Sequence, residues 1–180
     1  MLKLLLDICL AFIVLAALSP ILILVILVIL ILERKSPFFF QNRLGFNKTE
    51  FKIYKFRTML NQEITPLGKI LRKTGIDELP QLMNILKGQM SFVGPRPLTA
   101  ADINRLGWDS AYYDHRCSIR PGIVGLAQLT PVCHKKMSWF YDQLYIKSRS
   151  LWLDFKILMA AAIIPIVGKQ TVKNWIHGTK

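Results

Sequence analysis

The chain is poor in acidic side chains, in charge as a whole and in cysteine. Only 11 of its 180 residues are Asp or Glu, against 24 Lys or Arg, and charged residues make up 19% of the chain while hydrophobic residues make up 52%. So high an apolar content excludes an intrinsically disordered chain and is untypical of small nucleic-acid-binding modules. The length accommodates one domain, or one domain with a membrane anchor.

The 3 cysteines, Cys9, Cys117 and Cys133, are widely spaced and odd in number. No CxxC pair and no HxxxH companion accompanies them, which excludes a disulfide framework and gives no sign of a zinc site. We therefore expect the protein to lie in a reducing environment, on the cytoplasmic side.

Residues 8–32 form one long uncharged apolar run. The run exceeds the ~20 residues that a helix needs to cross a bilayer, and it is too long for the apolar region of a signal peptide. The net charge of +13 lies on the part of the chain that follows it. The positive-inside rule places that basic part in the cytoplasm, so the sequence predicts a membrane protein with a cytoplasmic body.

Ser19 and Pro20 stand near the middle of the apolar run. Pro20 removes one backbone donor and presses its ring against the Ala16 carbonyl, so the helix has to kink or break. Ser19 is expected to donate to the Leu15 carbonyl and to bend the helix further. Two half-helices would each reach only ~18 Å, enough to enter one leaflet and return. A kinked helix that spans the bilayer is the alternative, and the residues alone leave both open.

The basic body is predicted to be α-rich, of the α+β class. Residues 51–57 alternate apolar and basic side chains with period two, which predicts a half-buried strand with one cationic face. Residues 65–73 begin a short helix that carries three cations. Nothing indicates a second soluble domain, so we expect a membrane helix over residues 1–35 and a cytoplasmic domain over residues 36–180.

The segment after residue 138 is rich in aromatic side chains beside cations. This composition is typical of amphipathic helices that lie in the plane of a membrane interface. The uncharged stretch at residues 157–167 contains Pro165 and is too short to span a bilayer, so an interfacial helix and a core helix are both possible interpretations.

Asp77 and Glu78 form the most informative local pair. Leu79, Leu82, Met83 and Leu86 follow with helical spacing, Pro80 suits the first turn and Gly88 the position after the helix. Asp77 would then lie at or near the N-cap, and capping together with a favourable effect of Glu78 on the helix dipole would explain the pair.

The surroundings of that pair give a second interpretation. Three cations, Lys69, Arg72 and Lys73, precede it, and Arg96 follows in a rigid turn between two prolines. Carboxylates, clustered cations and a helix start together make a phosphate and Mg²⁺ site plausible. Lys55 and Arg57 could serve the same site, form a solvated strand face, or meet anionic lipid headgroups.

Four segments in order resemble the signatures of the bacterial sugar transferases, the monotopic phosphoglycosyl transferases that start glycan assembly on a polyprenol phosphate. They are KFRTM at 55–59, LRKTGIDELPQL at 71–82, MSFVGPRP at 90–97 and RPGIVGLAQ at 120–128. The similarity extends over nearly the whole chain, including the Ser19-Pro20 break, and matches the minimal catalytic form of the family. It implies a re-entrant helix with both termini cytoplasmic, at the bacterial inner membrane.

The resemblance also implies a reaction. Asp77 would attack the β-phosphate of a UDP-sugar, expel UMP and hold the phosphosugar as an ester, which polyprenol (undecaprenyl) phosphate would then remove. It implies that Asp77 and Glu78 are catalytic and that Glu78, with Asp77, holds Mg²⁺. The expected substrate contacts are Lys55, Arg57, Arg72, Arg96, Arg120 and Gln128. Inner-membrane lipids and downstream glycosyltransferases are further expected partners, and nucleic acid is not.

The sequence departs from the family pattern after residue 125. Leu126 stands where the family has Trp, and residues 129–136 replace its Asn-Gly-Arg-rich loop. Those positions bear on the sugar, for which an N-acetylated UDP-sugar is our guess, with UDP-galactose or UDP-glucose also open. A membrane-anchored basic domain that binds nucleic acid or lipid, and a structural subunit of a polysaccharide export complex, are the alternatives to an enzyme.

Overall fold

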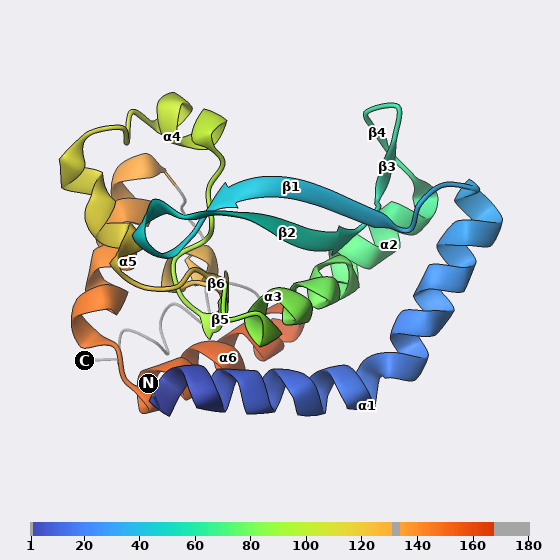
Figure 1. Ribbon diagram of the computed structural model, residues 1–180, viewed down its shortest axis with the longest axis horizontal. Helices are drawn as coiled ribbons and strands as arrows, with labels where there is room; N and C mark the ends of the chain where they lie inside the picture. Colours follow the sequence, from blue (N-terminus) through green and yellow to red (C-terminus); the bar gives the residue numbers. More distant parts are fainter. Residues whose placement is uncertain (1, 131–133, 168–180) are drawn as a thin grey trace. The chain divides into compact units, whose positions relative to one another are not determined.

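The computed structural model describes residues 2–130 and 134–167. This part of the chain is mostly helical and holds three small two-stranded sheets (Figure 1), which confirms the α-rich α+β prediction. It divides into two compact units. The N-terminal unit comprises residues 1–42 and 52–88, and the C-terminal unit comprises residues 43–51 and 89–180. The division into a membrane part at 1–35 and a cytoplasmic part at 36–180 stays a prediction.

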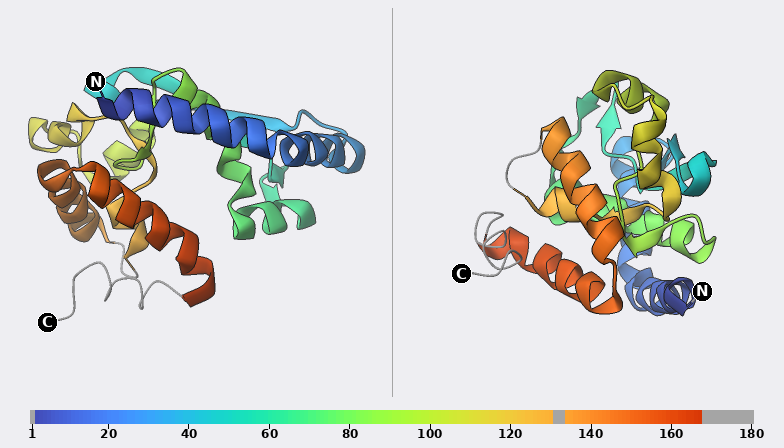
Figure 2. Two further views of the ribbon diagram at one scale, coloured as in Figure 1. Left: turned by 90° about the horizontal axis from the view of Figure 1, so that it is seen from below. Right: turned by 90° about the vertical axis from the view of Figure 1, so that its left-hand side faces the viewer.

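Helix α1 (Leu2–Glu33) begins the N-terminal unit and contains Pro20. Figures 1 and 2 show that this helix is bent rather than straight, as expected for an internal proline. The Ser19 hydroxyl donates to the Ala16 carbonyl at 2.8 Å. The expected bond to Leu15 is therefore wrong, and the reason is local: Ala16 is the residue whose carbonyl loses its donor to Pro20, which has no N–H.

Only one side of α1 is covered within the unit. Leu22 and Ile29 pack with Phe56 of strand β2 (Glu50–Phe56) and Leu71 of helix α2 (Pro66–Thr74) in one buried cluster. Apolar side chains elsewhere on the helix are exposed, for example Ile31, at 70%. Among the described residues, α1 is the one helix long and apolar enough to cross a membrane. That α1 re-enters the membrane rather than spanning it stays a prediction.

The strands of the N-terminal unit are short. Strand β1 (Phe38–Leu44) pairs with β2, and strands β3 (Met59–Leu60) and β4 (Glu63–Ile64) form an antiparallel hairpin. The boundary between the units falls inside β1 and β2. The predicted strand at 51–57 is confirmed, and Phe51 and Ile53 are buried as the alternation requires.

The next elements of the N-terminal unit are helical. Helix α2 starts as predicted, with Thr65 accepting a hydrogen bond from the Gly68 amide at 2.9 Å. It is followed by the 3-10 helix η2 (Ile76–Gln81) and by α3 (Leu82–Leu86), and Gly88 follows α3 at φ 68°.

The predicted apolar face of this segment is confirmed at Leu82, which is 2% exposed, and at Leu79, which packs on the buried cluster, but it is wrong at Met83. Met83 is 41% exposed, whereas Asn84 and Ile85 are both 0% exposed. Because residues 76–81 wind as a 3-10 helix, a single register of 3.6 residues per turn does not run through to residue 86.

The C-terminal unit is built around a parallel strand pair. Strands β5 (Ser91–Val93) and β6 (Gly122–Val124) pair Ser91 with Gly122 and Val93 with Val124. The other elements are η1 (Phe46–Lys48), α4 (Ala100–Leu106), η3 (Ala111–Ser118), η4 (Leu126–Leu129), α5 (Lys135–Ser148) and α6 (Leu151–Val167).

Helix α6 supports the core interpretation of residues 157–167, while an interfacial position stays a prediction. Ile157 and Ala160 are fully buried in the core, beside Val93 and Tyr145. Trp152 and Phe155 are 64% and 52% exposed and stack on each other. The helix therefore contributes to the core and also carries an exposed aromatic face.

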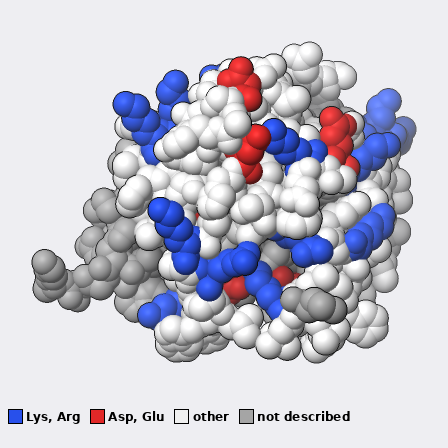
Figure 3. Space-filling model, turned by 60° about the vertical axis from the view of Figure 1, so that its left-hand side comes forward, with Lys and Arg blue, Asp and Glu red and all other residues white. Residues whose placement is uncertain are grey.

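The surface of the molecule reflects the scarcity of acids. On the face drawn in Figure 3, basic side chains are spread among neutral ones and acidic side chains are few.

Candidate active site

The predicted acidic pair lies at the start of η2. Gly75 ends α2 in the left-handed conformation, at φ 74°, and is itself the N-cap of η2. Asp77 therefore lies near the N-cap as expected, but Gly75 holds the N-cap position and no side chain caps it, so the interpretation that Asp77 caps the helix is wrong. The Asp77 carboxylate is thus not needed as the cap.

Asp77 is buried among charged groups of the N-terminal unit. The residue is 9% exposed. The Lys55 ammonium on β2 contacts the neighbouring Glu78 carboxylate at 2.5 Å, and the charges of Lys55 and Arg72 both act on Asp77. The structure therefore brings four of the predicted site residues together, namely Asp77, Glu78, Lys55 and Arg72.

The pKa of Asp77 is raised above its ordinary value. Burial is the largest cause and the adjacent Glu78 charge adds to it, whereas Lys55 and Arg72 lower the pKa. A carboxyl group whose pKa is raised by burial beside specific charged partners is a candidate catalytic group. As a carboxylate it is poorly solvated and therefore a stronger nucleophile than an exposed one.

Arg72 is held in place by the packing of α2. Its Nε donates to the Thr58 hydroxyl at 2.9 Å. Helix α2 approaches the backbone of Thr58 so closely that a Cβ at Gly68 would lie 2.1 Å from the Thr58 carbonyl oxygen. Only glycine permits this approach, so Gly68 allows Arg72 to reach Thr58; among the described residues, the two Nη atoms of Arg72 make no hydrogen bond.

Arg57, also predicted to contact substrate, is engaged by the backbone. Its Nε donates to the Ser36 carbonyl at 2.7 Å and its Nη2 to the Phe38 carbonyl at 3.3 Å. These contacts fix the chain where it leaves α1. A substrate contact by Arg57 stays a prediction.

Asn84 is a site-supporting residue that the sequence did not reveal. Its side chain is fully buried, its amide nitrogen donates to the Lys52 carbonyl at 2.7 Å, and its oxygen accepts from the Tyr54 amide at 3.0 Å. Asn84 thereby fixes the stretch of β2 that presents Lys55. The one sequence feature that could have indicated this role is the amide side chain of Asn84 within an otherwise apolar helical segment.

Arg96 and Arg120 belong to the C-terminal unit, where their segments are held together. The Gly122 amide donates to the Pro95 carbonyl at 3.0 Å and the Gly94 amide to the Val124 carbonyl at 3.0 Å. A Cβ at Gly122 would lie 2.1 Å from the Gly94 nitrogen, so the crossing requires glycine. The motif that contains Arg96 and the motif that contains Arg120 therefore cross each other with their backbones in contact.

Gln128 lies close to the same crossing. Its Oε1 is buried and makes no hydrogen bond among the described residues, and a Cβ at Gly125 would lie 2.8 Å from it. A buried amide oxygen without a donor is able to accept a hydrogen bond from a ligand.

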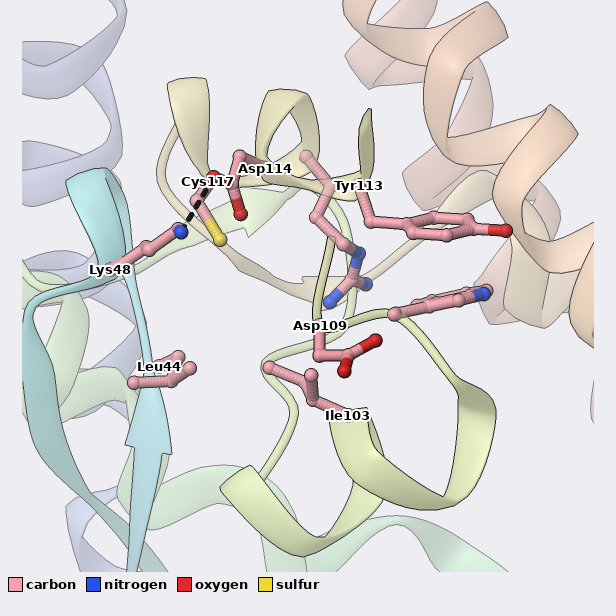
Figure 4. Close-up of a pocket in the computed structure, with 9 residues that line it drawn as sticks. Leu44, Lys48, Ile103, Asp109, Tyr113, Asp114 and Cys117 are labelled. Carbon is pink, nitrogen blue, oxygen red and sulfur yellow. Dashed lines mark ion pairs between the residues drawn. The ribbon is translucent and has the colours of Figure 1, made fainter. Parts of the chain in front are cut away.

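A small pocket of about 100 Å³ also lies in the C-terminal unit (Figure 4). Leu44 and Ile103 supply apolar walls, and the Lys48–Asp114 ion pair, at 2.6 Å, stands at its edge. Trp108 lines the pocket, but Tyr113 stacks on its ring and the Arg116 guanidinium lies 5.2 Å from its ring centroid. The pocket therefore leaves Trp108 little free aromatic face for a ligand.

The acidic pair can be tested as a magnesium site. The described residues contain no cluster of three or more His, Cys, Asp or Glu side chains that could hold a metal ion. Mg²⁺ is commonly bound by one or two carboxylates together with substrate phosphates and water. Asp77 and Glu78 fit that mode, with Lys55 paired to only one Glu78 oxygen.

Comparison with known proteins identifies the family. A family model described as bacterial sugar transferase matches residues 1–168, and the chain belongs to that family. The resemblance of its motifs to this family is thereby confirmed.

Named relatives cover most of this chain. The UDP-N-acetylgalactosamine-undecaprenyl-phosphate N-acetylgalactosaminephosphotransferase of Aeromonas hydrophila is 37% identical over 84% of this chain and 40% of its own length. The UDP-glucose:undecaprenyl-phosphate glucose-1-phosphate transferase of Klebsiella pneumoniae is 34% identical over 91% of this chain and 40% of its own. A protein of Bacillus subtilis described as an uncharacterized sugar transferase, EpsL, is 36% identical over 87% of this chain and 83% of its own length. This chain thus spans about two fifths of the first two relatives and most of the third.

Proposed function

We propose that this protein transfers a phosphosugar from a UDP-sugar to undecaprenyl phosphate with release of UMP, and so initiates the synthesis of a glycan such as a capsule, O-antigen, exopolysaccharide or glycoprotein glycan. The observation that carries the proposal is the buried Asp77 carboxylate beside Glu78, Lys55 and Arg72, in a member of the bacterial sugar transferase family. The names of the relatives support the two substrates.

In the first step an Asp77 carboxylate oxygen attacks the β-phosphorus of the UDP-sugar. A new O–P bond forms, the bond from that phosphorus to the bridging oxygen breaks, and the electron pair leaves with UMP. The product is an acyl phosphate in which Asp77 carries the phosphosugar. Lys55 and Arg72, whose charges act on Asp77, are proposed to oppose the negative charge that gathers on the phosphoryl oxygens.

In the second step a phosphate oxygen of undecaprenyl phosphate attacks the same phosphorus. The bond to Asp77 breaks, the carboxylate is regenerated, and a diphosphate-linked sugar leaves on the lipid. Each step forms one P–O bond and breaks one, so no oxidant or reductant is required. Two successive displacements predict ping-pong kinetics.

Glu78 and Asp77 would hold Mg²⁺, which supplies Lewis-acid stabilisation of phosphate charge when bound. The arginines of the C-terminal unit, Arg96 and Arg120, are proposed to contact the diphosphate, together with Gln128 as an acceptor. Arg57 is proposed as a further contact, after release from at least one backbone carbonyl.

The membrane arrangement belongs to the same proposal. One substrate is soluble and the other is a lipid, so the catalytic residues must work at the membrane surface. We propose that α1 enters the cytoplasmic leaflet of the inner membrane and returns at the Ser19-Pro20 bend, with both termini cytoplasmic, and that the exposed aromatic face of α6 lies in the interface. A single cysteine at residue 2, in a cysteine-free background, should be labelled from the cytoplasmic side, and labelling from the periplasmic side would contradict re-entry.

The sugar is best determined by direct assay. UMP release should be measured with undecaprenyl phosphate and a panel of UDP-sugars, beginning with N-acetylated ones and including UDP-glucose and UDP-galactose. Release with one of them supports the proposal. No release with any would favour a lipid-binding or nucleic-acid-binding domain, or an export subunit.

The covalent intermediate has its own test. Without undecaprenyl phosphate, the enzyme should exchange labelled UMP into its UDP-sugar and gain the mass of a phosphosugar. Exchange that survives Asp77→Asn would assign the covalent bond to another residue.

A further inference from the structure

The turn that presents Arg96 is anchored from a helix far along the chain. The Arg96 carbonyl accepts a hydrogen bond from Arg116 Nη2 at 3.0 Å. The same Nη2 lies 2.9 Å from the Asp142 carboxylate on α5, and Arg116 Nε lies 3.3 Å from it. A chain of contacts therefore runs from α5 through Arg116 to the backbone of the predicted phosphate-binding residue.

The Arg116–Asp142 pair is deeply buried. The side chains are 8% and 3% exposed, and the Arg116 guanidinium also lies over the Trp108 ring. A buried ion pair contributes little net stability, since desolvation offsets its attraction, but it fixes geometry well because its partners have few alternatives. This pair is therefore suited to positioning the turn rather than to stabilising the fold.

A second anchor comes from the same face of α5. The Tyr145 hydroxyl is shared between the Val93 carbonyl, at 3.0 Å, and the Asp154 carboxylate of α6, at 2.6 Å. Val93 ends β5 and immediately precedes the turn, and Tyr145 is 2% exposed. Asp142 and Tyr145 are three residues apart, so one helix face reaches both ends of the segment.

We propose that Asp142, acting through Arg116, and Tyr145, acting on Val93, are positioning residues that set the place of Arg96 for diphosphate binding. The proposal rests on the proposed function, in which Arg96 contacts the substrate. Neither residue is proposed to touch the substrate itself.

The decisive experiment is a double-mutant cycle in the full chain. We would measure kcat and KM for the UDP-sugar in the wild type, Asp142→Asn, Arg96→Ala and the double variant. Asp142→Asn should lower kcat/KM at least tenfold, mainly through KM, in the wild type, and less than twofold once Arg96 is absent. Equal losses in both backgrounds would mean that Asp142 supports the fold in general, and would overturn the proposal.

Two further variants serve as controls, one in case Asp142→Asn does not fold and one for the chemical change itself. Tyr145→Phe removes one oxygen and keeps the ring, so it should fold if Asp142→Asn does not, and it should show the same dependence on Arg96. Asp114→Asn makes the same chemical change as Asp142→Asn in an ion pair whose side chains are 53% and 38% exposed, and kcat/KM should stay within twofold.

Amide hydrogen exchange gives a readout without activity. Asp142→Asn should speed exchange at Gly94 and Gly122, whose amides donate to the Val124 and Pro95 carbonyls, while Asp114→Asn should not. Unchanged exchange in Asp142→Asn would refute positioning of the turn. If the wild type released no UMP, the proposed function would fail, and exchange would still decide whether α5 positions the turn.

Discussion

The two units each contain a carboxylate paired with a cation, and the two pairs differ in burial. In the N-terminal unit Lys55 and Glu78 are 17% and 28% exposed, whereas in the C-terminal unit Arg116 and Asp142 are 8% and 3% exposed. Lys55 also acts on the charge of Asp77, while Arg116 also holds a backbone carbonyl.

This difference separates a pair that a ligand can rearrange from one that it cannot. A partly exposed pair contributes about 1 kcal/mol or less, so a phosphate or a metal ion can compete for either partner. Breaking a buried pair leaves an uncompensated charge and costs about 3–5 kcal/mol. The first arrangement suits a reacting site and the second suits a support, and the following predictions test this contrast.

The largest effect is expected at Asp77. Asp77→Asn keeps the size of the side chain but removes the proposed nucleophile, so UMP release should fall at least about a thousandfold. Because the amide carries no charge to desolvate, the melting temperature should not fall. Asp109→Asn, an exposed position, should retain activity within twofold, and equal activity in Asp77→Asn would remove Asp77 from the mechanism.

The contrast itself can be tested with two alanine variants. Arg116→Ala should lower the free energy of unfolding by about 3–5 kcal/mol because Asp142 remains buried and charged. Lys55→Ala should change it by about 1 kcal/mol or less, yet lower kcat/KM about tenfold or more. Denaturant unfolding and steady-state kinetics measure both, and a larger stability loss in Lys55→Ala would reverse the contrast.

The backbone crossing between the two arginine segments has a steric test. Gly122→Ala would place a Cβ 2.1 Å from the Gly94 nitrogen and should cost about 3 kcal/mol. Gly107→Ala is the matched control, because nothing lies within 4 Å of its Cβ and only its φ of 67° opposes the change, at about 1 kcal/mol. Similar melting temperatures for the two variants would contradict the close crossing.

The smallest effect concerns pH. The folded-state pKa of Asp77 is raised, so the carboxylate form, the proposed nucleophile, is lost as the pH falls through that pKa, and kcat/KM should then drop up to about tenfold per pH unit. The raised pKa has the opposite effect on the free energy of unfolding, which rises as the pH falls. The penalty of burying the charge is fully present above the folded-state pKa and vanishes below the ordinary value of 3.8. Asp77→Asn should abolish this contribution, which thermal unfolding against pH would measure, and an unchanged pH dependence would assign it elsewhere.

Local signals predicted the local structure well. Thr65 and Pro66 start α2, the alternation at 51–57 gives β2, and Gly88 follows α3 with positive φ, because each depends on residues close in sequence. The failures have a local cause as well. The apolar spacing from Leu79 to Leu86 fits one α-helix, but η2 winds more tightly, so Met83 turns outward and Asn84 inward.

The candidate acidic pair was visible in the sequence because acids are scarce and Asp77-Glu78 stands beside cations. The supports of the site were not visible. Arg116 and Asp142 are separated by 26 residues, and Tyr145 and Val93 by 52. No pattern of side chains within a few residues encodes such contacts, since they arise only when distant segments pack.

The sequence by itself therefore determined the apolar helix with its proline bend, the basic character, the acidic pair and the family. The tertiary structure decided what each charge does. It buries Asp77 and so raises the pKa of that carboxyl group. Arg57 donates hydrogen bonds to backbone carbonyls, and Arg116 donates one to the backbone carbonyl of Arg96. The physical reason is that composition fixes which charges are present, while burial and neighbours, which only packing sets, fix their energies and their partners.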